Sequence, residues 1–195
     1  AVASFAATAG TTYYIAFDNR WTTSNNFSFQ VTEGIYAPMP VSFTQQTIAQ
    51  SANICNVADM NGDYLDDIVT VQNNQMTILT QLAGGGFATN VYSLPNLVTT
   101  PGWSIAAGDY DKNGFNDLVF GGGSRLTVIK ANTNGTAYTE VTYPQGIFTQ
   151  RTNFIDINND GHLDLFACHD VAQSHAYRND GNGNLIFNIN FFPTL

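Results

Sequence analysis

The stretch NVADMNGDYLDDIVTV, at residues 56–71, decides the fold because the chain contains three versions of it. It returns as AAGDYDKNGFNDLVFG at 106–121 and as NFIDINNDGHLDLFAC at 153–168. The first aspartates of successive copies are 50 and 47 residues apart. That period is too short for a globular domain per copy and suits a small unit that stacks on its neighbours. A repeat protein is therefore predicted, with units at about 51–98, 99–147 and 148–195.

Each unit has the pattern of four β-strands with an acidic loop after the first strand. In the first unit, β-branched and aromatic residues alternate with polar ones, and turns rich in Asn or Gly separate the segments. This alternation predicts strands at 54–58, 68–71, 76–82 and 88–94, and in the third unit an outer strand at 185–192. No window keeps the i, i+3, i+4, i+7 spacing of a helix, so the predicted fold class is all-β.

The first 50 residues differ from the repeats. Apolar segments at 11–17 and 27–33 predict two strands, and the two prolines of GIYAPMP, which begins at Gly34, suit a linker. We expect residues 1–33 to be tail strands of a preceding β-sandwich or adhesin-like domain. Residues 34–50 are expected to form a linker and the first outer strand.

Charge and hydropathy argue against several classes of partner. Six Lys and Arg residues against 15 Asp and Glu residues give a net charge of −9, which disfavours nucleic-acid backbones and anionic membranes. No apolar stretch is long enough to cross a membrane. Charged residues make up only 11 % of the chain, so Asn, Thr, Ser and Gln supply the polar surface, as in extracellular β-proteins. We expect the chain to be secreted or held at the cell surface.

The ends and the cysteines add further expectations. The N-terminal AVASFAATAG is no signal peptide as it stands, so we expect residues to have preceded it, and FFPTL is expected to end between two repeats. Cys55 and Cys168 are too few for a disulfide framework. They form one disulfide or, as we expect, remain two buried free thiols.

The acidic loops carry oxygen side chains at positions 1, 3, 5 and 9, and three of the four are carboxylates in each loop. Two like charges about 4 Å apart repel by roughly 4 kcal/mol at an effective dielectric constant near 20, and a divalent cation removes this cost. Hard oxygen ligands, with no His or Cys side chain at the repeating positions, favour Ca²⁺ over Zn²⁺ or copper. About three Ca²⁺ ions per chain are therefore predicted. Their predicted ligands are the side chains of Asp59, Asn61, Asp63, Asp67, Asp109, Asp111, Asn113, Asp117, Asp156, Asn158, Asp160 and Asp164, and the position 7 carbonyls of Leu65, Phe115 and His162.

The turn inside the first loop differs in sequence from the other two. Gly114 and Gly161 at position 6 allow a positive φ in the second and third loops. The first loop has Tyr64 there and Gly62 at position 4, so its turn must differ or carry about 1 kcal/mol of strain. Whether this loop binds Ca²⁺ as well as the other two stays open.

The loop sequences are also compatible with ordinary turns and with two helical calcium-binding modules. Asp, Asn and Gly form turns in which side chains bond their own backbone, although three such loops in register between strands favour a shared ligand. The EF-hand and the dockerin module share the first half of the spacing. They would need flanking helices and an acidic residue at position 12, where Thr70, Phe120 and Ala167 stand in strand-like segments.

The segments DMNGDYLDDIV, DYDKNGFNDLVF and DINNDGHLDLF, with the turns AGGGF and YRNDGNGN, resemble the VCBS or FG-GAP repeats of integrin α-subunit heads and of secreted bacterial surface proteins. The resemblance covers about residues 51–195. It implies a β-propeller in which each blade carries a Ca²⁺ loop between its first two strands, with ligands at the positions given above. Three blades make only a partial propeller, so the chain is expected to be part of a longer one or to associate with other copies to close it.

The histidines and one cysteine fit a structural role better than a reactive site. CHD at 168–170, with His162 and His175 nearby in sequence, could suggest a metal or nucleophilic centre. Cys168 follows an apolar strand, as a small buried residue would, and His169 and Asp170 then fall at its solvated end.

Aromatic residues leave one binding alternative open. Trp21, Trp103, Tyr110 and Tyr138 could stack on sugars, or could pack within and between blades. No GxSxG, HExxH or phosphate-binding loop is present in the sequence, so we do not expect an enzyme.

Together these features predict a calcium-stabilised extracellular module for binding, adhesion or surface assembly. Its expected partner is an extracellular protein, a glycan or another copy of the chain, and neither nucleic-acid binding nor membrane insertion is expected. Two alternatives remain: a lectin-like, glycan-binding module, and an accessory region of a polysaccharide-acting enzyme.

Overall fold

The computed structural model describes residues 11–12, 45, 47–48, 52, 54–188 and 190. The chain divides into two units, Ala1–Ile48 and Ala49–Leu195, and the fold described below belongs to the second unit. The predictions for residues 1–33 and 34–50 fall almost entirely outside the described residues.

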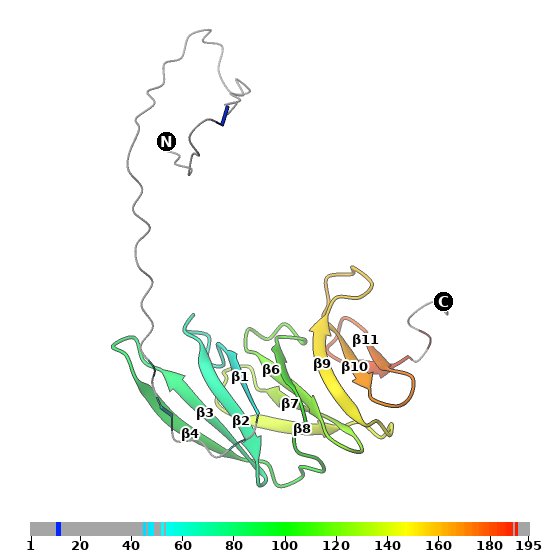
Figure 1. The fold of residues 1–195 in the computed structure, drawn as a ribbon, viewed down its shortest axis with the longest axis horizontal. Helices are drawn as coiled ribbons and strands as arrows, with labels where there is room; N and C mark the ends of the chain where they lie inside the picture. The colour runs from blue at the N-terminus through cyan, green and yellow to red at the C-terminus, as the bar shows by residue number, and fades with distance from the viewer. Residues whose placement is uncertain are drawn as a thin grey trace. The chain divides into compact units, whose positions relative to one another are not determined.

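Three four-stranded antiparallel sheets make up the described part of the second unit, and the prediction of an all-β fold is confirmed (Figure 1). We name the sheets blade one, blade two and blade three in chain order. No helix long and apolar enough to cross a membrane occurs among the described residues. Blade one contains β1 (Cys55–Ala58), β2 (Asp67–Gln72), β3 (Gln75–Gln81) and β4 (Phe87–Ser93); blade two contains β5 (Ile105–Gly108), β6 (Asp117–Gly121), β7 (Leu126–Ala131) and β8 (Tyr138–Thr142); blade three contains β9 (Thr149–Ile155), β10 (Asp164–His169), β11 (His175–Asn179) and β12 (Leu185–Phe187).

Strands within each blade pair in chain order, as consecutive hairpins do. In blade one, Asn73 and Asn74 both have positive φ, which is the backbone of the two-residue turn that suits the twist of a hairpin. The outer strand predicted at 185–192 is shorter among the described residues, because β12 spans Leu185–Phe187 and residues 188 and 190 are not in a strand; residues 189, 191 and 192 lie outside the described part. The side chain of Asn188 accepts a hydrogen bond from the Asn190 N–H, and such a turn diverts the chain from the sheet.

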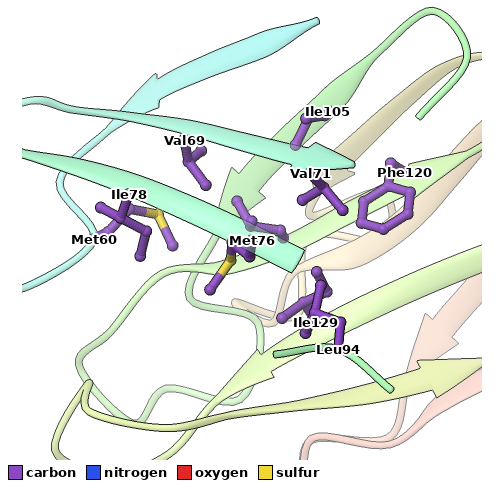
Figure 2. Packing of buried hydrophobic residues seen from close by; sticks show 10 residues of the cluster. Met60, Val69, Val71, Met76, Ile78, Leu94, Ile105, Phe120 and Ile129 are labelled. Carbon is purple, nitrogen blue, oxygen red and sulfur yellow. The ribbon is translucent and has the colours of Figure 1, made fainter. Parts of the chain in front are cut away.

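The blades stack face to face through their apolar residues. The first strands of successive blades are neighbours, since β1 contacts β5 and β5 contacts β9. One core cluster joins blades one and two, and a second joins blades two and three. Figure 2 shows the first cluster, in which Val69, Val71 and Met76 of blade one meet residues of blade two. The described residues therefore form a partial propeller, without a closed ring.

Each blade has two different faces, set by strand alternation. We call the face toward the following blade the forward face and the other the rear face. In blade one, the paired residues Val69 and Ile78 lie on the forward face, in the cluster shared with blade two. In blade two, Leu118 and Phe120 lie on the rear face and enter that same cluster. A forward face therefore always meets a rear face.

Side-chain amides add polar contacts between neighbouring blades. Asn56 on the forward face of blade one donates to the Ile105 carbonyl at 2.8 Å. Asn179 of blade three donates to the Tyr110 carbonyl of blade two at 2.8 Å. These bonds fix one blade against the next at particular backbone atoms, which apolar packing alone would not do.

Both cysteines are free, but the expectation that both are buried is wrong: Cys55 is exposed and Cys168 is partly buried. Cys55 is paired with Thr70 on the rear face of blade one, and Cys168 is paired with Arg151 on the forward face of blade three. No further blade among the described residues covers either face.

Substitution of Leu118 tests whether the blades unfold as one unit. Leu118→Ala is expected to lower the free energy of unfolding by about 2–5 kcal/mol, because it removes a buried side chain where two blades meet. Urea titrations followed by circular dichroism and by intrinsic fluorescence should report one shared transition. The exposed Val98→Ala is the control and should change stability by no more than about 0.5 kcal/mol. Two transitions, with one unchanged by Leu118→Ala, would mean that the blades are independent.

Candidate metal centre

Each acidic loop joins the first and second strands of its blade, at the same place in all three sheets. The loops connect β1 to β2, β5 to β6, and β9 to β10. Position 1 is the residue after the first strand, and position 9 is the first residue of the second strand. Equivalent loop residues can therefore be compared directly between the blades.

The aspartate at position 9 is buried in every loop and fastens the loop to the blade. In blade two, Asp117 accepts the N–H of Tyr110 at 3.2 Å through Oδ2 and the N–H of Ala131, the last residue of β7, at 2.8 Å through Oδ1. The same pair of bonds recurs around Asp67, with Met60 and Gln81, and around Asp164, with Ile157 and Asn179. Position 9 thus joins position 2 of the loop to the end of the third strand.

The aspartate at position 1 organises the turn from inside. In blade two, Asp109 accepts the N–H groups of positions 5 and 6, from Asn113 and Gly114, both at 2.9 Å. Asp59 and Asp156 accept N–H groups from the same two positions in their loops. The side chain at position 3 also accepts the N–H of position 5, and that at position 5 accepts the N–H of position 7, in all three loops.

Loop one has the same backbone as the others despite its different glycine. Positions 4 and 6 have positive φ in every loop: Gly62 and Tyr64, Lys112 and Gly114, and Asn159 and Gly161. Of the two alternatives from the sequence, a different turn is therefore wrong. In each loop, one of these two residues is not glycine and therefore carries strain at positive φ. This residue is Tyr64 at position 6 in loop one, with φ 66°, and Lys112 or Asn159 at position 4 in the other two loops.

Loop two brings three carboxylates together. Oxygens of Asp109, Asp111 and Asp117 lie within 4.8 Å of one another, a convergence found only in this loop among the residues described. Burial raises the pKa of Asp117 to about 7; the N–H groups of Ala131 and Tyr110 lower it, whereas the neighbouring charges of Asp111 and Asp109 raise it further. The negative charge at this point is poorly solvated and crowded, so a cation there would be strongly attracted.

A basic side chain from the third strand reaches two of the three loops. Lys130 Nζ lies 2.8 Å from Asp111 Oδ2 in blade two, and Arg178 Nη2 lies 3.9 Å from Asp160 Oδ2 in blade three. Both residues come just before the third-strand residue that donates to position 9. Blade one has the uncharged Thr80 at this place. The loops therefore share one backbone but differ in local charge.

The donor set of the loops fits Ca²⁺. Side chains at positions 1, 3, 5 and 9 offer only carboxylate and amide oxygens, the hard ligands that Ca²⁺ prefers. The ammonium group of Lys130 lies beside Asp111, which shows that the carboxylates of loop two attract positive charge. The described structure places all twelve predicted side-chain ligands in three equivalent loops.

Comparison with known proteins agrees with this geometry. The model of the FG-GAP-like repeat matches residues 59–120 and 109–167, which together exceed half of the chain. The chain belongs to the FG-GAP-like repeat family. No curated protein matches the chain significantly.

FG-GAP repeats are typical of extracellular binding and adhesion proteins, and they often bind calcium. The two matched segments span the three loops and end at Ala167 in blade three. The predicted family and the predicted propeller blades are therefore confirmed, whereas the secreted bacterial type remains a prediction.

The aromatic residues proposed as a sugar platform do not form one among the described residues. Tyr110 is buried and stacks on Phe154, and Tyr138 packs edge-on against Tyr92. Trp103 is exposed and contacts Phe148. Trp21 lies outside the described residues. Packing within and between FG-GAP blades accounts for Tyr110 and Tyr138.

Among the described residues, the histidines and the cysteine of blade three do not bring three metal-ligating atoms together. The rings of His169 and His175 are 6.1 Å apart, and His169 Nδ1 accepts the N–H of Val171. Burial, with a smaller effect of His169, lowers the pKa of His175. The ring of His175 packs edge-on against Phe187.

Lys130 and Arg178 were missed by sequence reasoning, because they lie 19 and 18 residues from the loop carboxylates that they approach. The alignment of the units contains a weak signal for these two basic residues. Once the strands are aligned, both occupy the same place in the third strand of their units.

Exchange of Gly62 tests the backbone of loop one. Gly62→Ala is expected to lower the free energy of unfolding by about 1–2 kcal/mol, because φ is +80° there. The added Cβ would lie at an ordinary 3.5 Å from Phe115, so the cost arises in the backbone. Gly84→Ala is the control: it has open space and no positive φ, and should be neutral or slightly stabilising. Equal effects of the two substitutions in urea titrations would contradict the assigned turn.

Proposed function

We propose that this chain is a calcium-stabilised extracellular module for binding, adhesion or surface assembly, and not a catalyst. The observation that carries the proposal is the loop network repeated in all three blades, which presents oxygen side chains from the same four positions each time. Membership of the FG-GAP-like repeat family supports it. The proposed location is secreted or at the cell surface.

One Ca²⁺ ion per loop, about three per chain, would be held by positions 1, 3, 5 and 9 and the carbonyl at position 7. Bound there, Ca²⁺ supplies a double positive charge that offsets the repulsion among the carboxylates. Hydrogen bonds from the loop residues then connect the ordered loop to the rest of its blade and to the neighbouring loop. Asp117 joins loop two to β7, and Asn116 of the same loop donates to the Asp59 carbonyl of loop one at 2.8 Å.

The proposed partner is an extracellular protein, a glycan or another copy of the chain. The net charge of −9 supports neither nucleic-acid binding nor attachment to an anionic membrane. The glycan-binding alternative has little support, because Tyr110, one of its proposed stacking residues, is buried between blades. The accessory role beside a polysaccharide-acting enzyme has no described residue that favours it.

Removal of calcium tests the proposal directly. Dialysis against excess EDTA should lower the melting temperature, and added Ca²⁺, but not equimolar Mg²⁺, should restore it. A single site held at 100 times its dissociation constant contributes about 2.7 kcal/mol. Metal analysis of the native protein should find about three Ca²⁺ ions per chain. No bound metal together with an unchanged melting curve would sink the calcium proposal.

A pair of aspartates in blade three gives a matched control. Asp160 and Asp180 both accept N–H groups close by in the chain, and hydrogen bonds lower the pKa of both. Only Asp160 belongs to the acidic loop. Asp160→Asn should abolish or weaken one Ca²⁺ site in a calorimetric titration, whereas Asp180→Asn should leave all of them.

Lys130 should compete with the ion in loop two. Lys130→Met is expected to tighten Ca²⁺ binding at this loop by about three- to tenfold, because a positive charge beside Asp111 is removed. Lys112→Met removes the same charge from an exposed position of the same loop and should have a smaller effect. Terbium luminescence titration measures both. Weaker binding after Lys130→Met would show that Lys130 supports the site and does not compete with the ion.

A further inference from the structure

The chain contains four Asn-Gly pairs, and the structure places all of them in turns outside the strands. They are Asn61-Gly62, Asn113-Gly114, Asn134-Gly135 and Asn182-Gly183. Asparagine is a chemically labile residue. It is most labile before glycine, because glycine has no side chain to hinder ring closure between its own nitrogen and the asparagine side chain. The sequence alone therefore offers four equal candidates for loss of the side-chain amide.

In this reaction the glycine nitrogen attacks Cγ of the preceding asparagine. The N–Cγ bond forms, the Cγ–Nδ2 bond breaks, and ammonia leaves with the proton of the glycine N–H. Water then opens the resulting succinimide at one of its two carbonyl carbons, which leaves aspartate or, with the main chain passing through Cγ, isoaspartate. A glycine N–H that donates a hydrogen bond is held back from this attack, since that bond must break first.

Three of the four glycine nitrogens are held in this way. The N–H groups of Gly62 and Gly114 donate to the position 1 aspartates of their loops at 2.7 and 2.9 Å. The N–H of Gly135 donates to the Asn132 carbonyl at 3.0 Å. A carboxylate acceptor also opposes loss of the proton, because the negative nitrogen would then face a negative charge.

The asparagine side chains of the same three pairs are held as well. The side-chain oxygens of Asn61 and Asn113 each accept the N–H two residues further on in their loops. The side-chain oxygen of Asn134 accepts both the N–H and the hydroxyl of Thr136. Rotation of these side chains toward the glycine nitrogen would break these bonds.

The fourth pair, in the turn between β11 and β12, lacks these restraints. Asn182 is exposed, and the N–H of Gly183 donates to no acceptor in the part of the chain that the structure describes. The side-chain amide of Asn182 makes one long hydrogen bond, 3.5 Å to the Asp180 carbonyl. Both the attacking nitrogen and the carbon that it attacks are therefore free to meet.

The fold also explains why glycine follows Asn182. Gly183 has φ +76°, and a Cβ there would lie 2.8 Å from Cβ of Asp111 in the neighbouring blade. Position 183 therefore requires glycine for its backbone and for its packing. The packing of blade three on loop two thus creates the reactive pair.

We propose that Asn182 is a site of spontaneous deamidation, with the nitrogen of Gly183 as the attacking group. The reaction needs only water, so the inference goes beyond the proposed function and is independent of calcium. Consecutive Cα atoms are 3.8 Å apart, so the new carboxylate arises within roughly 10 Å of Asp111. Isoaspartate also lengthens the main chain by a methylene group, which displaces Gly183 from Asp111.

Peptide mapping of the full chain after incubation in mildly alkaline buffer tests the site. Replacement of the amide by a hydroxyl should appear first in the peptide that contains Asn182, as separate aspartate and isoaspartate products. Asn134 is the matched internal control, because it is exposed, precedes a glycine with positive φ and lies in the corresponding turn of blade two. Asn182 should react at least about tenfold faster than Asn134, whose turn must first break several hydrogen bonds.

Two further samples separate structure from sequence. In denaturing urea the hydrogen bonds are absent, so all four asparagines should react at similar rates. Asn182→Gln keeps an exposed amide but closes its larger ring much more slowly, so it should remove the fast product from the folded chain. The purified isoaspartate form should melt below Asn182→Asp, because only isoaspartate changes the backbone beside Asp111.

Two outcomes would overturn the inference. One is a folded chain in which Asn182 reacts no faster than Asn134. The other is the same order of rates in urea as in the folded chain, because sequence and not structure would then set the order. Both are measured without added metal, so they are independent of the calcium proposal.

Discussion

A buried carboxylate at the start of the second strand of each blade is the constraint on which the fold depends. Its two oxygens accept N–H groups from the loop before it and from the end of the third strand, so one side chain fixes a turn and two strands. Loss of an acceptor would leave buried N–H groups unpaired, at a cost of about 1–3 kcal/mol for each. The same arrangement in Asp67, Asp117 and Asp164 explains why three loops of different sequence have one backbone.

This anchoring also has an electrostatic consequence. Because the position 9 aspartate is held in the core, the other loop carboxylates lie near a buried negative charge. The carboxylates lie closest together in loop two. In blades two and three, a basic residue of the third strand lies beside a loop carboxylate, whereas blade one has no basic residue at this place. Backbone geometry and charge are therefore separable properties of these loops, and equal shape does not imply equal affinity for a cation.

The stack of blades has a direction, because each blade has two different faces. Because forward and rear faces differ, successive blades stack in one sense only, with a forward face on a rear face at each junction. Asn56 donates a hydrogen bond across the junction of blades one and two, and Asn179 donates one across the junction of blades two and three. The stability of the stack therefore depends on one kind of contact, which is used at both junctions between the described blades.

The sequence by itself determined the strands, the three loops and the residues within them, because alternation along a strand and bonds two to five residues apart are local. It also led to two errors, the burial of both cysteines and the length of the last strand, which depend on neighbours that the pattern does not contain. Only the tertiary structure decided that Tyr64 adopts the common turn, that Lys130 meets Asp111 and that Cys55 and Cys168 lie on opposite outer faces. Each of these depends on backbone anchoring or packing between residues distant in the chain, which no local periodicity records.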